Sequence, residues 1–123
     1  MRSIEDKLSC NTGTSTYYTY RTIGNVLIGY YTDGIKHMAE LCKAYWLIDV
    51  VMSYQTMKFR RQHPFQVWII KQDGDGAIVI AEDGDNKKIK QQKIPFTTFP
   101  FDEFTEPFKM FFCNDVLHLP SEY

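Results

Sequence analysis

Residues 33–61 constrain the fold more than any other part of the chain, because their apolar side chains recur at helical spacing. Thr32 or Asp33 is suited to cap the start. One broad face holds Ile35, Met38, Ala39, Cys42, Tyr45, Trp46, Asp49 and Met52. The spacing predicts a long central helix, which would span about 43 Å. A compact domain of this length is about 35 Å across, so we expect the last turns to project or bend.

The segments on either side of this helix read as β-strands, rich in β-branched and aromatic residues. Residues 15–22 and 26–31 predict a first hairpin around Gly24-Asn25, and a short helix could precede it at residues 3–8. Further strands are predicted at residues 65–71, 77–82, 87–94, 108–113 and 116–119. We therefore expect one α+β domain over residues 1–123, with a single antiparallel sheet of about five to six strands packed on the long helix. The order is hairpin, helix, meander, with the lysine-rich segment 87–94 as an edge strand.

Composition and charge exclude several classes of protein. The net charge of −1 argues against a dedicated nucleic-acid binder and against a strongly acidic DNA mimic. The chain has three cysteines, an odd number, and no two of them have C-x-x-C spacing: Cys10, Cys42 and Cys113. We therefore expect reduced thiols in a cytosolic protein, with no disulfide framework or zinc site. The start of the chain lacks the apolar core of a signal peptide, and the apolar run at 44–52 is too short to span a membrane. No signature of a nucleotide or other cofactor is found.

The segment around residues 71–86 could be a calcium loop or a pair of turns. With Asp73, Asp75 and Gly76 at positions 3, 5 and 6 of an EF-hand loop, Glu82 falls at position 12. Position 1 is then Lys71, a cation where the first carboxylate ligand belongs. The flanking residues also favour strands over helices. We therefore predict hairpin turns rather than a metal site. His37, His63 and His118 have no metal-ligand spacing either.

Asp49 lies in the most apolar stretch of the predicted helix. A carboxylate in such a place needs a partner or shifts its pKa. It is either a structural anchor or a functional acid. In the second case its pocket at the helix–sheet junction would also hold Tyr45, Trp46, Tyr17 and Tyr31.

Two surface features are candidates for binding. Seven phenylalanines fall between residues 96 and 112, and the loop residues Phe99 and Phe101 flank Pro100. If this loop does not fold back over the core, Phe99, Phe101, Asp102 and Glu103 form an aromatic patch suited to protein recognition. A small basic cluster at the end of the predicted helix, formed by Lys58, Arg60 and Arg61, is a weaker candidate for nucleic-acid binding.

Several motifs together are distinctive. They are TGTSTYY at 12–18, YTDGIKHMAE at 31–40, AYWLIDVV at 44–51, FQVWII at 65–70, FTTFPFDEF at 96–104 and LPSEY at 119–123. With these motifs the chain resembles, over nearly its whole length, a family of small bacterial proteins, a domain of unknown function often encoded on phages, plasmids and other mobile elements. The resemblance implies no activity, cofactor or catalytic residue. It implies a setting in a bacterial cytoplasm, where one role of such accessory proteins is to inhibit a host defence system.

The sequence therefore favours a non-enzymatic protein-binding protein, such as a phage inhibitor of host defence of the anti-CRISPR type. The partner would be another protein, with a homodimer through the projecting helix end left open. The alternatives are a small enzyme or ligand-binding protein with a pocket around Asp49 and, more weakly, a nucleic-acid binder.

Overall fold

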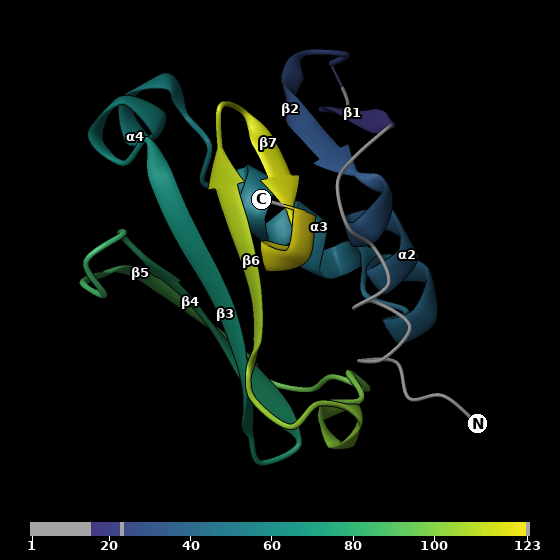
Figure 1. Ribbon diagram of the computed structural model, residues 1–123. Coiled ribbons are helices and arrows are strands. Elements are labelled where there is room, and N and C mark those ends of the chain that lie inside the picture. The colour runs from purple at the N-terminus through teal and green to yellow at the C-terminus, as the bar shows by residue number, and fades with distance from the viewer. Residues whose placement is uncertain (1–15, 23, 123) are drawn as a thin grey trace.

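The computed structural model describes residues 16–22 and 24–122, which form an α+β fold built on one seven-stranded sheet (Figure 1). The strands are β1 Tyr17–Arg21, β2 Leu27–Thr32, β3 Phe65–Asp73, β4 Gly76–Glu82, β5 Lys88–Ile94, β6 Phe108–Cys113 and β7 Val116–His118. The helices are α2 Asp33–Cys42, α3 Tyr45–Ser53 and α4 Met57–Gln62, with short 3₁₀ turns η1 Phe101–Glu103 and η2 Pro120–Glu122. The helix predicted at residues 3–8 lies outside the described residues.

The sheet has more strands than predicted and is mixed. Its order is β1-β2-β7-β6-β3-β4-β5. Every pair is antiparallel except β2 and β7, which run parallel, with Tyr30 opposite Val116 and Tyr31 opposite Leu117. The prediction of a wholly antiparallel sheet of five to six strands was therefore wrong. Short β7 connects the N-terminal hairpin to the meander, and hydrophobic alternation says nothing about which strand becomes the neighbour of another.

The predicted long helix is also wrong, because residues 33–62 form three helices. Lys43 takes a left-handed conformation, with φ 53° and ψ 47°, and ends α2. Residues 54–56 separate α3 from α4, and Thr56 Oγ1 caps α4 by accepting from Phe59 N at 3.1 Å. The breaks let the helical segment follow the sheet instead of projecting beyond it. The predicted start is confirmed, since Thr32 Oγ1 accepts from Ile35 N at 3.3 Å.

The predicted turns and the edge strand are confirmed. Asn25 between β1 and β2 has φ 62°, and Asn114 and Asp115 between β6 and β7 have φ 52° and 65°. Two successive residues with positive φ match the twist of a tight hairpin, and Asn and Asp tolerate this conformation better than most residues. β5 lies at one end of the sheet.

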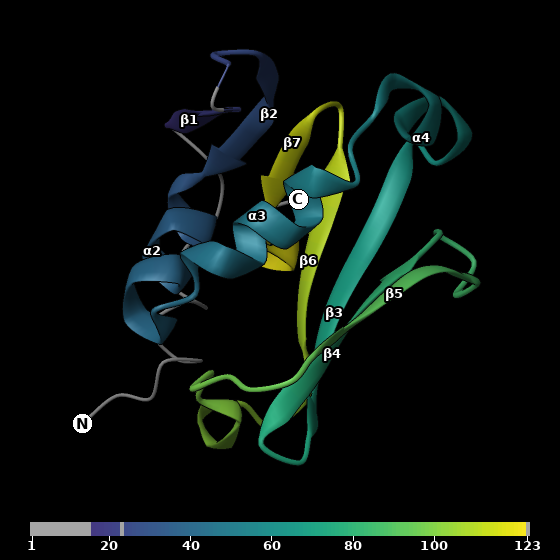
Figure 2. The same cartoon turned by 180° about the vertical axis from the view of Figure 1, so that it is seen from behind.

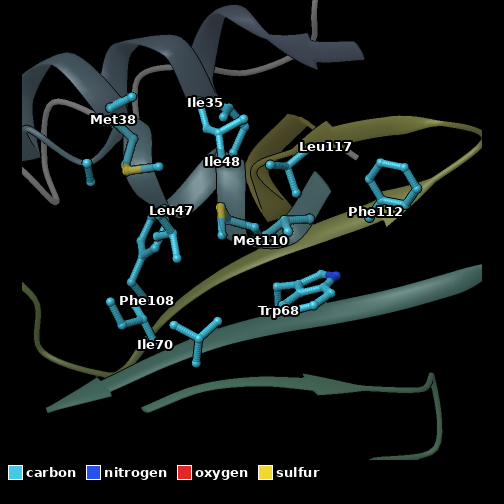
Figure 3. Packing of buried hydrophobic residues seen from close by; sticks show 14 of the residues in the cluster. Ile35, Met38, Leu47, Ile48, Trp68, Ile70, Phe108, Met110, Phe112 and Leu117 are labelled. Carbon is cyan, nitrogen blue, oxygen red and sulfur yellow. The ribbon is translucent and has the colours of Figure 1, made fainter. Parts of the chain in front are cut away.

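Helices α2 and α3 pack on one face of the sheet and form the main core with it (Figure 3). The strands contribute Trp68, Met110, Phe112 and Leu117, all at most 2% exposed. Their helical partners are Ile35, Met38, Leu47 and Ile48, which the views place opposite the strands. Four residues of α3 are buried in this core: Leu47, Ile48, Val51 and Met52.

A buried amide pair is the polar exception inside this core. Gln55 Nε2 donates to Gln66 Oε1 at 2.7 Å, and Gln66 Nε2 donates to Gln55 Oε1 at 3.0 Å. Trp68 Nε1 donates to the same Gln66 oxygen at 2.8 Å. The pair ties the loop after α3 to β3, and its groups satisfy one another away from water.

The YTDG and LPSEY motifs meet at the start of α2. Glu122 Oε1 accepts from Thr32 Oγ1 at 2.7 Å and from Leu119 N at 2.9 Å, while Oε2 accepts from Gly34 N at 3.1 Å. A carboxylate is favoured at a helix N-terminus, where backbone N–H groups lack helical acceptors. A Cβ on Gly34 would collide with this carboxylate, which explains the glycine. Both motifs therefore have a structural role.

Candidate protein-binding surface

The sheet has one covered face and one open face. α3 lies behind β6 and β7 in Figure 1 and in front of them in Figure 2, so it covers one side of these strands, and buried residues of α2 and α4 join the same core. No helix among the described residues covers the opposite side of the sheet, which we call the open face. Its side chains follow from the strand register, because successive residues point to opposite faces.

Six apolar side chains lie next to one another on the open face, and we call them the apolar row. They are Phe65, Val67, Ile69, Ile78, Ile80 and Phe111. Ile69 stands opposite Ile80, and Val67 opposite Phe111. None of the six belongs to the core cluster under the helices. Ile69 is 6% exposed because its neighbours surround it, and the other five are half-buried.

The apolar row departs from what an outer sheet face normally carries. In antiparallel sheets with one solvated face, apolar residues alternate with polar ones along each strand. β3 instead runs Phe-Gln-Val-Trp-Ile-Ile and is apolar on both faces at Val67, Trp68, Ile69 and Ile70. Such continuous apolar runs are typical of strands that are covered on both sides. The open face therefore has the apolar composition that is typical of a sheet face covered by other parts of a protein or by a partner.

The charges around the apolar row are mostly positive, with one carboxylate, Glu82, opposite Val67. Lys71 stands opposite Ile78, and Lys109 opposite Ile69. Both lysines are exposed, and neither forms an ion pair with any residue in the described ranges. Lys93 lies opposite Ile78 on the other side and is 3.8 Å from Asp73 Oδ2. A partner with acidic groups around an apolar centre would complement this arrangement.

A shallow hollow of about 270 Å³ adjoins the row where β2, β7 and β6 meet. It is lined by Tyr17, Thr32, Cys113, Asn114, Val116, His118 and Glu122. Burial raises the pKa of the Cys113 thiol and lowers the pKa of the His118 imidazole, so both groups favour their neutral forms. A nucleophilic cysteine needs the opposite, a lowered pKa. Cys42 is no better suited, because burial and then the charge of Glu103 raise its pKa to about 12.

The structure does not assemble the pocket predicted around Asp49. Asp49 is exposed, and its Oδ1 accepts from Tyr20 Oη at 2.7 Å. Tyr45 is also exposed, and its hydroxyl donates to Glu40 at 3.3 Å. Tyr17 lines the hollow on the open face, whereas Tyr31 stacks on Tyr18 at 5.5 Å on the helix side. We expected Asp49 to be buried because it lies in an apolar stretch. That expectation was wrong, since α3 has one side facing water and Asp49 lies on it.

Tyr20 is the partner of Asp49 that sequence reasoning missed. Burial raises the Tyr20 pKa to about 12, together with the hydrogen bond to Asp49 and the charge of that carboxylate. The sequence carried only a weak signal for the contact, since several tyrosines alternate in the first strand. Only the position of β1 relative to α3 decides which of them reaches Asp49. The anchor interpretation of Asp49 is the one that this contact supports.

The phenylalanine loop folds back over the core, so of the two alternatives that the sequence left open, the exposed aromatic patch is not the one formed. Phe99 is 5% exposed and lies 5.7 Å from Phe104 and 6.0 Å from Phe108, measured between ring centroids. Phe101 is half-buried and 5.1 Å from Phe99, so only Asp102 and Glu103 of the predicted patch are exposed. The ring that remains outside is Phe96, which is 70% exposed and which the sequence analysis did not single out.

Arg60, one of the three residues of the predicted basic cluster, has a structural role. Arg60 Nη1 donates to Ile28 O at 2.7 Å and to Asp115 Oδ1 at 3.1 Å, which holds α4 against β2 and the β6–β7 turn. Only Lys58 and Arg61 remain exposed for a nucleic-acid backbone. With α4 held in this way, the helix end that would have projected toward a second copy is absent.

The acidic glycine-rich segment is a hairpin turn, as predicted. β3 ends at Asp73 and β4 begins at Gly76, opposite each other, with Gly74 at φ 58°. The second acidic turn is held by Asp83 Oδ1, which accepts from Asp85 N and Lys87 N at 2.8 and 2.9 Å. Within residues 16–22 and 24–122, no three His, Cys, Asp or Glu side chains come together as metal ligands.

The comparison with protein families decides the affiliation of the chain. The chain belongs to a family of unknown function, DUF6876, whose model matches residues 2–123. The resemblance inferred from the motifs is thereby confirmed at the level of the family. No curated protein and no solved structure matches the chain. Among the helices that the structure describes, none is long and apolar enough to cross a membrane.

Proposed function

We propose that this DUF6876 protein is a non-enzymatic binding protein and that its partner, another protein, docks on the open face of the sheet. The observation that carries the proposal is the apolar row, whose six side chains lie side by side on a face without a described helix over it. Contiguous apolar surface outside the core is a common mark of a protein-binding site. Aliphatic and aromatic side chains that already pack on one another lose little freedom on binding.

The surroundings of the row define the kind of partner. Lys71 and Lys109 border it, so the matching surface should have an apolar centre with carboxylates at the rim. A second copy of the chain would present a rim of the same, mostly positive charge, which makes it a less complementary partner for this face than an acidic protein. The raised pKa values of Cys42 and Cys113 support a binding role over nucleophilic catalysis.

A matched pair of variants tests the proposal. Ile80→Glu places a charge in the apolar row, and Val26→Glu places the same charge at a turn residue that is 58% exposed and outside the row. Wild type and both variants are used as baits in a bacterial lysate, after thermal unfolding shows that all three are folded. We expect a protein retained by wild type and by Val26→Glu to be lost with Ile80→Glu.

The retained protein is then purified, identified and titrated against wild type. We expect its affinity for Ile80→Glu to be weaker by about tenfold or more, as for a residue near the centre of an interface. Amide exchange of the complex should show protection in β3, β4 and β6. Equal affinity for both variants, or protection confined to the helices, would rule out the open face as the site.

The narrower part of the proposal concerns the setting. We propose that the partner is a component of a host defence system and that the chain acts in the bacterial cytoplasm, encoded on a mobile element. The motif resemblance supports this part. The test is phage plating on a host that carries a defence system, with and without the protein. Wild type and Val26→Glu should raise plaque counts and Ile80→Glu should not, whereas unchanged plating with every defence system tried would contradict the role.

A further inference from the structure

Strand β5 offers a second surface that does not depend on the open face. It is the last strand in the sheet order, and it runs for seven residues from Lys88 to Ile94. β4 pairs with one of its edges, and no described strand pairs with the other. The backbone N–H and C=O groups along that outer edge can therefore accept another extended segment.

The edge is strongly positive. Residues 87–94 contain four lysines and no acidic residue, and Lys87, Lys88, Lys90 and Lys93 are all exposed. The acidic side chains nearest in register are Glu82, opposite Lys88, and Asp73, which lies 3.8 Å from Lys93. Asp83 lies across the turn from Lys87, so Lys90, opposite Ala81, is the one lysine of residues 87–94 without an acidic cross-strand neighbour among the described residues. Lysines on an edge keep identical edges apart, and for the same reason they attract a segment of opposite charge.

An apolar groove begins where β5 ends. It has a volume of about 400 Å³ and is lined by Lys43, Trp46, Ile94, Phe96, Thr97 and Thr98. Trp46 is half-buried, and Phe96 is 70% exposed, the largest exposed fraction among the big apolar side chains of the described residues. In Figure 2 the chain that leaves β5 crosses toward the side of the molecule where α2 lies, which places one wall of the groove beside the α2–α3 corner.

These two features adjoin along the chain, because Ile94 is both the last residue of β5 and part of the groove. An extended peptide lying along β5 would thus reach the groove with the side chains at its end. We propose that β5 and this groove bind an extended acidic segment of another protein by strand addition, with one large apolar side chain seated between Trp46 and Phe96. Lys43, at the rim of the groove, adds a further positive charge for the same segment.

A second copy of the chain is the less suitable occupant. Pairing two β5 edges would bring lysines of one copy close to lysines of the other, and like charges on adjacent strands destabilise pairing. An acidic segment removes this repulsion and leaves the apolar side chain free to cover Phe96. The binding should weaken as salt is raised, because the lysines are exposed to solvent.

Selection from a displayed library of random linear peptides tests the inference with the intact protein. We expect the retained peptides to be rich in Asp and Glu around one large apolar residue, and to bind without forming a helix. Isotope-labelled protein then locates the bound peptide, whose addition should shift amide signals of β5 and of residues 94–98. Selection of basic or helical peptides, or of none, would overturn the inference, as would shifts confined to β3 and β6.

Two variants and a control identify the contacts. Phe96→Ser removes the exposed wall of the groove and should weaken the selected peptide by about tenfold, as expected for an anchor residue. Lys90→Glu should weaken it by a similar factor and reduce its salt dependence. Met57→Ser, at a side chain that is 64% exposed on α4, should leave the affinity unchanged. If Phe96→Ser binds the selected peptide as tightly as wild type, the groove is not part of the binding site. Ile80→Glu should also bind the peptide with unchanged affinity, which would show that this surface is separate from the open face.

Discussion

The two faces of the sheet are built from the same strands and have different environments. On the helix side, Trp68 and Met110 stand opposite each other and are each 1% exposed. On the open side, the next pair along the same two strands is Val67 and Phe111, and both are half-buried. The residue types are similarly apolar, so composition does not separate the faces. The comparison teaches that the strands make two apolar surfaces, of which the helices within residues 16–22 and 24–122 cover one.

The largest effect should come from the centre of the covered face. Trp68→Ala removes a buried ring and its hydrogen bond to Gln66, and it should lower the free energy of unfolding by about 3–5 kcal/mol. Phe111→Ala, an aromatic deletion on the open face, should lower it clearly less because that ring is already partly in water. Denaturant unfolding of both variants measures the difference. Equal losses would mean that the open face is a core in its own right.

The buried amide pair should give the second largest effect. Gln66→Leu leaves the Gln55 amide and the Trp68 N–H without their buried acceptor, and it should lower the free energy of unfolding by about 1–3 kcal/mol. The double variant Gln55→Leu/Gln66→Leu removes both members of the pair. Its stability, measured in the same denaturant series, should recover part of that loss. A double variant that is less stable than Gln66→Leu would show that the pair does not act through mutual satisfaction.

Truncation on the open face should have a smaller effect on stability. Ile80→Ala removes methyl groups that solvent already reaches, and it should lower the free energy of unfolding by about 1 kcal/mol or less. Thermal unfolding and affinity for the open-face partner are measured on the same sample. A large loss of stability with unchanged affinity would mean that the open face serves stability rather than binding.

The smallest effect on stability should come from Asp49, at the exposed rim of the covered side. Because the pKa of Tyr20 is raised from 10.0 to about 12, its contribution to stability is complete below pH 10 and is lost as pH rises toward 12. Asp49→Asn removes the carboxylate charge and should move the Tyr20 pKa back toward 10.0. Phenolate absorbance follows this titration. An unchanged Tyr20 pKa would show that burial alone sets it. Unfolding of the variant near neutral pH would show that the fold depends on the Asp49 carboxylate.

Local features of the fold were predictable where neighbouring residues control them. Thr32 caps α2, Asn25 and Asn114-Asp115 turn their hairpins, and the segment around Asp73 reverses the chain, all as the sequence indicates. The break at Lys43 was not predictable, because a lysine carries no signal for a left-handed helix end. Apolar periodicity continues through such a break whenever both helices bury their sides against the same sheet.

The candidate sites were predicted less well than the elements, since each depends on a contact between distant segments. The sequence suggested that Phe99 could face solvent, but it stacks on Phe104 in the returning loop. The sequence predicted Arg60 as a cation available for binding, but its guanidinium donates a hydrogen bond to Ile28 O. The apolar row was hidden because β3 reads as one continuous apolar run, and that run does not say which of its two faces the helices will cover.

By itself, the sequence determined the class of the fold, its strand segments, its turns and its family, because turn chemistry, capping and side-chain alternation act within a few residues. The tertiary structure alone decided that one strand pair runs parallel, that the helical segment divides in three, and that the described helices cover one apolar face of the sheet and not the other. Those outcomes depend on pairing and packing between residues far apart in the chain, where many arrangements bury similar area and only their geometric fit selects one.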